Sequence, residues 1–120
     1  MNVRINDKIF PAEVMSTPDE IEKGMMNRDT LNGCMVFKLG KGHHSFWMKN
    51  CLIPLDIVFI LNGRISRIHH NCPPADRHSL TPPRYTGIGD HVIEFPGGSC
   101  SNFKVGDKVN LYLGSPKNPI

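Results

Sequence analysis

A chain of 120 residues with 39% hydrophobic and 21% charged side chains has the composition of one soluble globular domain, not of a disordered protein. Its net charge of +3 comes from basic residues interleaved with acids, which argues against nucleic-acid binding. We expect a single domain over residues 1–120, with its core at about 3–113 and a frayed tail at 115–120.

Neither a membrane span nor an export signal is expected. The longest apolar run, Leu52 to Leu61, contains Pro54 and Asp56 and is far shorter than the roughly 20 residues of a membrane helix. Residues Met1 to Asp7 lack the basic start and unbroken apolar centre of a secretory signal. The sequence therefore predicts a cytoplasmic protein without a membrane partner.

The chain begins with a predicted β-hairpin. Val3 to Val14 alternates partially between apolar and polar residues and turns at Asn6-Asp7. A helix start follows, in which Thr17 caps the helix, the next residue is a proline, and Glu20 reaches back to the cap. We expect this helix to end near Asn27, with Ile21 and Met25 on its buried face.

Beyond Gly33 the pattern becomes that of strands. Cys34 to Lys38 and His44 to Lys49 are apolar or aromatic runs, separated by Gly40-Lys41-Gly42, which predicts a turn. Leu55 to Leu61 is almost continuously apolar, which is typical of a strand in the interior of a sheet.

The Asn62-Gly63 pair predicts a two-residue hairpin turn into a strand at Arg64 to His70, because both residues tolerate positive φ. Asn71 to Gly89 is rich in proline and predicts a long loop. A strand at His91 to Phe95 follows. Three further elements are expected at the C-terminal end: a short helical turn at Ser99 to Phe103, a turn at Val105 to Asp107, and a strand through Val109, Leu111 and Leu113.

These elements predict a mainly β fold. About eight short strands and one α-helix in the N-terminal half are typical of a small β-sandwich or barrel, similar to a jelly roll.

The only tryptophan stands at the most distinctive point of the chain. Residues two apart in a strand share a face, so Trp47 and Lys49 are expected to point the same way, and Phe46 and Met48 the other way. An indole beside an ammonium group suits a sugar ring, a nucleobase or an anion. The alternative is that Trp47 only closes the end of the barrel while Lys49 extends into water.

Two carboxylates border apolar strands and therefore need partners. Asp56 follows Pro54 at the start of the apolar run, and Glu94 lies between Ile93 and Phe95. Each has a structural interpretation as a group that stabilises a turn or strand. If they converge, they form a general acid/base pair or a cation site.

The cysteine and histidine residues give weaker signals. Cys34, Cys51, Cys72 and Cys100 lie far apart, and free thiols are expected in a reducing compartment. Cys51, which follows Lys49-Asn50, is the best placed of the four for thiol chemistry. No metal and no cofactor are expected, because the histidine pairs lack the spacing of a zinc site. Those pairs are His43-His44 and His69-His70.

Several segments resemble the family known as domain of unknown function 192, over about Val14 to Val109. They are Glu22 to Arg28, Gly33 to Phe37, Ser45 to Asn50, Ile53 to Ile57, Val92 to Glu94, and Val105 to Asp107. The resemblance implies a small, mostly β domain of sandwich or barrel type with a helix near its start. The family occurs in bacteria, archaea and some phages, and has no established activity, cofactor or catalytic residue.

The chain departs from that family pattern at two places. Cys51 stands where the family tends to have threonine, and the loop after Asn71 has only Cys72 where some members have paired cysteines. By the resemblance, these departures argue against a shared loop disulfide or metal clip.

Three functional hypotheses remain open. The first is a non-enzymatic domain that binds a small ligand or a carbohydrate. The second is a hydrolase that uses Asp56 and Glu94, or thiol chemistry at Cys51. The third is a protein-interaction or accessory module, related to phage infection or stress. For the first hypothesis, the expected ligand-binding residues are Arg28, Trp47, Lys49, Asn50, Asp56 and Glu94.

Overall fold

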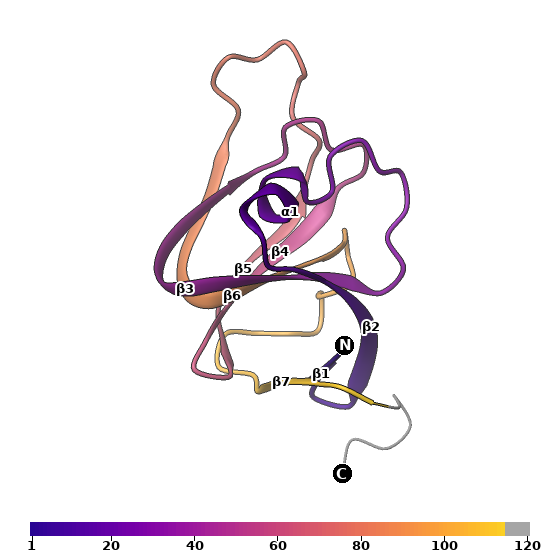
Figure 1. The fold of residues 1–120 in the computed structure, drawn as a ribbon, viewed down its shortest axis with the longest axis vertical. Coiled ribbons are helices and arrows are strands. Elements are labelled where there is room, and N and C mark those ends of the chain that lie inside the picture. Colours follow the sequence, from indigo (N-terminus) through magenta and orange to yellow (C-terminus); the bar gives the residue numbers. More distant parts are fainter. Residues whose placement is uncertain (115–120) are drawn as a thin grey trace.

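In the computed structural model, which describes residues 1–114, seven strands form one curled sheet in the order β5-β4-β6-β3-β2-β1-β7 (Figure 1). The mainly β fold class with one helix, of the small barrel or sandwich type, is confirmed. The tail expected at 115–120 lies outside the described residues. The strands are β1 (Asn2–Ile5), β2 (Lys8–Met15), β3 (Cys34–Trp47), β4 (Leu55–Leu61), β5 (Arg64–Cys72), β6 (Arg84–Pro96) and β7 (Val109–Tyr112), and the helix is α1 (Pro18–Lys23).

The sheet is antiparallel except for the parallel pair of β2 and β3. It curls far enough that one end of β5 meets the segment before β7, where Ile65 N donates to Asp107 O at 2.9 Å and Val109 N donates to Gly63 O at 2.9 Å. The first and last strands are neighbours, with Asn2 opposite Tyr112. The result is a half-barrel closed at one end by backbone hydrogen bonds.

The elements with strong local signals form as expected. The turn at Asn6-Asp7 joins β1 to β2, and Asn62 and Gly63 join β4 to β5 with φ values of 52° and 76°. Strand β4 lies between β5 and β6, so both of its edges are paired, as expected for the apolar run. The described residues contain no helix that is long and apolar enough to cross a membrane.

The start of α1 carries the expected capping box. Glu20 N donates to Thr17 Oγ1 at 3.2 Å, and Thr17 N donates to Glu20 Oε1 at 3.0 Å. The predicted end near Asn27 is wrong, because the helix stops at Lys23 and Gly24 follows with a φ of +42°. A residue with that φ cannot continue a right-handed helix.

The predicted turn at Gly40-Lys41-Gly42 is also wrong. Strand β3 runs through it with a shift of register between Lys38 and Gly42, so the two expected strands are one, and the sheet has seven strands instead of about eight. Glycines tolerate the backbone of such a bulge, and the pairing with β6 resumes beyond it.

The loop predicted at Asn71 to Gly89 is shorter than expected. Strand β6 begins at Arg84, and the projecting loop in Figure 1 comprises residues 73–83. Thr86, Gly87 and Ile88 pair with β3, and a Cβ on Gly87 would lie 2.7 Å from the Phe59 ring. Ser99 to Phe103 forms turns instead of the expected helical turn.

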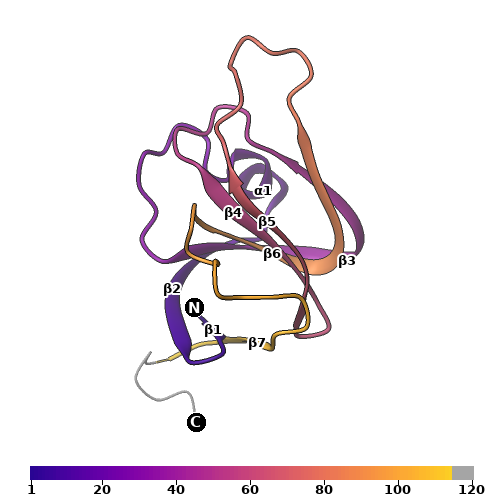
Figure 2. The same ribbon diagram turned by 180° about the vertical axis from the view of Figure 1, so that it is seen from behind.

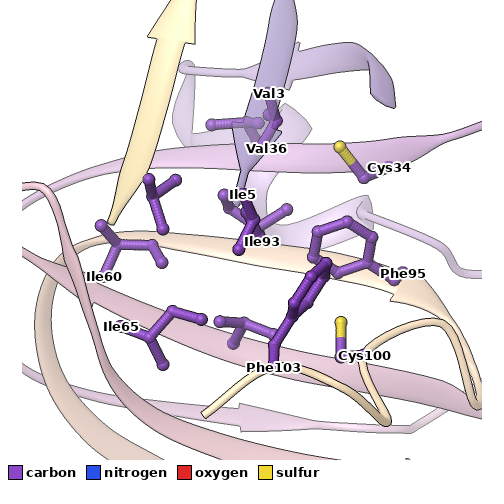
Figure 3. Close-up of a cluster of buried hydrophobic side chains, with 12 residues drawn as sticks. Val3, Ile5, Cys34, Val36, Ile60, Ile65, Ile93, Phe95, Cys100 and Phe103 are labelled. Atoms are coloured by element: carbon purple, nitrogen blue, oxygen red, sulfur yellow. The ribbon is translucent and has the colours of Figure 1, made fainter. Parts of the chain in front are cut away.

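Two hydrophobic clusters cover the two faces of the central strands. The views in Figures 1 and 2 place α1 over one face and β1 with β7 on the other side. On β6, Ile93 and Phe95 face the β1 and β7 side, whereas Val92 faces the α1 side. Figure 3 shows the first cluster, which includes Val3, Ile5, Cys34, Val36, Ile60 and Phe103. The second cluster includes Met25, Phe37, Met48, Cys51 and Phe59.

Candidate functional site

A pocket with a volume of about 280 Å³ opens on the α1 side of the sheet. It lies between α1 with the following residues, strand β3, and the side chains that β6 contributes. Its walls are mainly apolar. They include Ile21, Met25, Met26, Phe37, Leu39 and Phe46.

Glu94 is one of the most deeply buried residues that line this pocket, with only 4% of its surface exposed. It lies on β6 between Met35 of β3 and Ile57 of β4. Burial raises the pKa of its carboxyl to about 8, and no hydrogen bond from the described residues opposes this effect. At neutral pH the carboxyl is therefore mostly protonated and can donate as well as accept a hydrogen bond.

The exposed side of the pocket is rich in cations. Arg84 is the register partner of Trp47, and its guanidinium carbon lies 4.1 Å from the centroid of the Trp47 ring. The Lys49 ammonium lies 5.1 Å from the same centroid, so the structure brings Trp47 and Lys49 together. Lys23 and Glu22 lie on the α1 side. In the described part of the chain, no carboxylate forms an ion pair with Arg84, Lys49 or Lys23.

Asn50 does not line the pocket, but its backbone connects two segments that do. Its φ is +59°, and its carbonyl oxygen accepts a hydrogen bond of 2.7 Å from the backbone of Asn27, which also has a positive φ. Met26 and Cys51 form a β-bridge next to this contact, and both line the pocket. Asn50 therefore acts through its backbone, which ties the segment after α1 to the segment after β3.

Asp56 lies away from the pocket and has a structural role. Its carboxylate is fully buried and accepts hydrogen bonds from three backbone N–H groups, at 2.8 Å from Asn71, 3.1 Å from Gly98 and 2.8 Å from Cys100. Asp56 is the register partner of Phe95, which faces the β1 and β7 side. Glu94 faces the other side, so the two carboxyl groups do not converge into an acid/base pair.

Arg28 also lies outside the pocket lining. It forms a bidentate ion pair with Glu13, with N–O distances of 2.9 and 2.7 Å. The same hydrogen bonds lower the pKa of Glu13 and raise that of Arg28. This pair joins β2 to the segment after α1.

All four cysteines are free and buried. Burial and, secondarily, the nearby Glu94 raise the pKa of the Cys51 thiol to about 12, which opposes formation of a nucleophilic thiolate. The pKa of Cys72 is raised to about 11 by burial, then by Asp56 and Glu94. Within residues 1–114, no group of three His, Cys, Asp or Glu side chains is arranged to hold a metal ion.

Sequence reasoning missed Arg84, Lys23 and His44 as residues of this pocket. The proline-rich composition of Asn71 to Gly89 predicts a loop that includes Arg84, although the Tyr85-Thr86 pair that follows Arg84 consists of residue types that favour strands. Lys23 and His44 carry no sequence signal of their own. Lys23 lines the pocket because α1 lies over the sheet, and His44 lines it because it lies on β3 itself.

The fold and this pocket define a small, mostly β protein in which one short helix and a curled sheet enclose a cavity with an acidic residue in its interior. Residues 1–111 match the family profile of domain of unknown function 192, described as "Uncharacterized ACR". The chain belongs to this family, as its resemblance indicated.

Two solved structures are similar to this chain over most of its length. A protein of unknown function from Novosphingobium aromaticivorans has 32% identity and a TM-score of 0.79, with 92% of this chain and 84% of that one covered. A putative transcription regulator from Sinorhizobium meliloti has 28% identity and a TM-score of 0.77, with 91% of each chain covered. No curated protein gave a significant match.

Proposed function

We propose that this protein is a non-enzymatic domain that binds a small ligand in the pocket beneath α1. The observation that carries the proposal is the Glu94 carboxyl, which is 4% exposed, lines the pocket and receives no hydrogen bond from the described residues. A carboxyl group that is largely removed from water and receives no hydrogen bond from the protein costs free energy. A ligand that hydrogen-bonds to Glu94 recovers this energy, and such a group is therefore a recognition point.

The size of the pocket limits the ligand. A volume of about 280 Å³ lies just below the range of about 300–1,000 Å³ that is typical of small-molecule sites. Apolar walls and a few polar groups that fix orientation are the usual composition of such sites. The ligand is therefore a small organic molecule with an apolar body.

Chemical groups around the pocket favour binding over catalysis. The Cys51 thiol has a pKa of about 12, which makes it a poor nucleophile at neutral pH. Glu94 does not pair with Asp56, which faces the opposite side of the sheet, and the other acid of the lining, Glu22, lies on the exposed side. For a carbohydrate, stacking on Trp47 competes with Arg84, which already lies 4.1 Å from the ring centroid.

A protein-interaction module is the competing proposal, supported by one observation. The loop of residues 73–83 projects from the sheet (Figure 1). Leu80 in this loop is 97% exposed. An exposed leucine in a loop is a small contact surface, and isolated exposed apolar residues are common.

We also propose a cytoplasmic location, because four free buried thiols suit a reducing compartment.

Ligand binding can be tested through Trp47, the only tryptophan of the chain, because it lines the pocket and its fluorescence reports on binding there. A panel of sugars, nucleotides, small acids and small amines is screened by Trp47 fluorescence and by thermal shift. The proposal expects at least one saturable ligand that raises the melting temperature and binds at least tenfold more weakly to Glu94→Gln. The same ligand binds normally to Arg77→Gln, at an exposed position outside the pocket lining. Ligands that bind equally to Glu94→Gln, or a panel without any saturable ligand, would overturn it.

A further inference from the structure

The polar groups of the pocket are separated into two regions of different charge. The interior holds one carboxyl, that of Glu94, and the solvent-exposed side holds Lys23, Lys49 and Arg84 against the single acid Glu22. Most of the remaining lining is apolar, and it includes Met25 and Phe37, which are no more than 2% exposed. This arrangement favours a ligand with a positive group at its inner end, near Glu94, and a negative group at its outer end, near the cations.

The interior end lacks a positive charge. Glu94 forms no ion pair with any described residue, and the titratable groups that lie near it are the thiols of Cys51 and Cys72. Both thiols stay protonated at neutral pH, because burial raises their pKa values to about 12 and about 11. An ammonium group offers Glu94 both an opposite charge and N–H donors, which a neutral ligand offers only in part.

The outer end lacks a negative charge. Arg84 and Lys49 make cation–π contacts with the Trp47 ring, and both cations keep N–H groups for a further partner. A guanidinium group held in this way presents the paired donors that fit a carboxylate or a phosphate. The described residues supply no acid that pairs with either cation.

We infer that the ligand is a zwitterion whose ammonium and acid groups are separated by an apolar body, with the ammonium at Glu94 and the acid at Arg84 and Lys49. This inference rests on the proposed function and names the class of ligand for the same pocket. An α-amino acid does not satisfy it, because its two charges are adjacent. A straight-chain ω-amino acid is the simplest molecule that does.

Binding of such a ligand moves one proton. The ammonium enters with its charge, and the protonated Glu94 carboxyl releases its proton to the solvent to form the ion pair. Binding therefore strengthens as pH rises from 6 to 8, up to tenfold per pH unit. Over this range the thiols of Cys51 and Cys72 keep their protons, because burial raises their pKa values to about 12 and about 11. His44, which also lines the pocket, lies on the exposed side with its ring 2.6 Å from Gly40 O.

The test compares four probes with the same chain: 6-aminohexanoate, hexylamine, hexanoate and 1-hexanol. The four-carbon and eight-carbon members of each class control for length. Titration calorimetry of the intact protein at pH 7, in two buffers of different ionisation enthalpy, measures affinity and proton release together. We expect the ω-amino acid of best length to bind at least tenfold more tightly than any singly charged or neutral probe, with about one proton released.

Matched variants assign each end of the ligand. Glu94→Gln is expected to abolish proton release and to remove the advantage of the amine. Arg84→Gln is expected to remove the advantage of the acid but to keep proton release. Arg77→Gln, at an exposed position in the loop of residues 73–83 and outside the pocket lining, is the control and binds as wild type.

Each failure has a distinct meaning. Tightest binding of hexanol or hexanoate, weakened in Glu94→Gln, overturns the zwitterion and keeps the pocket as a ligand site. Equal affinities for all probes, or binding of the ω-amino acid without proton release, also overturns the inference. Failure of every probe at every length overturns the zwitterion, while the wider panel with Trp47 fluorescence still decides the proposed function.

Discussion

Asp56 and Glu94 are both buried carboxyl residues on adjacent strands, yet they project from opposite faces of the sheet. The register explains this arrangement, since Asp56 is opposite Phe95 and Glu94 is opposite Ile57. One carboxylate accepts three backbone hydrogen bonds, and the other receives none from the described residues. Similar sequence surroundings have therefore produced one structural anchor and one group that faces a cavity.

Replacement of Asp56 by alanine is expected to destabilise the protein by about 3–5 kcal/mol, because three backbone N–H groups lose a charged acceptor. Urea unfolding followed by Trp47 fluorescence measures the change. The control is Asp76→Ala in the exposed loop, where the carboxylate accepts only from His78 N and the expected loss is under about 1 kcal/mol. Equal losses in the two variants would contradict the role of Asp56.

Glu94 is expected to make stability fall as pH rises. Its pKa is raised from 4.5 to about 8 in the folded state, so the folded protein holds an extra proton between these values. The stabilisation is complete below about pH 4.5 and is lost as pH rises through 8, at roughly 1 kcal/mol per pH unit. Unfolding free energies at pH 5, 6, 7 and 8 measure the slope.

Glu94→Gln removes this contribution, so its stability is expected to decline less steeply than that of wild type over the same range. Glu22→Gln, on the exposed side of α1, is the control and keeps the wild-type slope. If Glu94→Gln and wild type have parallel pH profiles, the carboxyl is ionised in the folded protein and the proposed proton release fails with it.

The cysteine thiols are expected to resist alkylation in the folded protein. Burial raises the pKa of Cys34 to about 12, and raises that of Cys100 still further with help from Asp56. Labelling at pH 8 is therefore expected to be at least about a hundredfold slower than in urea. Mass spectrometry counts the labels, and Cys51, at 9% exposure beside the pocket, reacts first. Rapid labelling of any cysteine in the folded state refutes this expectation.

Gly87→Ala is expected to destabilise the protein by about 1–3 kcal/mol, because the new Cβ would lie 2.7 Å from the Phe59 ring. Gly40→Ala is the matched control on β3, since a Cβ there meets nothing within 4 Å. Thermal unfolding compares the two. A Gly87→Ala protein as stable as Gly40→Ala would mean that Phe59 moves aside without loss.

Elements set by neighbouring residues were predictable from the sequence. The capping box at Thr17 and the positive-φ pair at Asn62-Gly63 need only short-range contacts, and both form as expected. Elements decided by distant partners were not. The continuity of β3 through Gly40 and the early start of β6 at Arg84 both depend on their pairing with each other.

The candidate site divides in the same way. Alternation predicted that Trp47 and Lys49 lie together, and they do, although β3 ends at Trp47 and Lys49 lies in the turn that follows. An acid among apolar residues marked Glu94. The contribution of Arg84 depends on its register opposite Trp47, which no local pattern contains. The same limit applies to Asp56, because only the pairing with β6 shows which face it occupies.

The pairing of the first strand with the last has a consequence for synthesis on the ribosome. One edge of β1 lacks its partner until Val109 to Tyr112 have emerged, whereas every residue that lines the pocket lies between Ile21 and Glu94. The pocket side of the sheet therefore needs no lining residue made after Glu94, whereas the opposite side is incomplete until β7 has been made. Unpaired strand edges favour aggregation, so this late closure makes β1 the vulnerable part of the newly made protein.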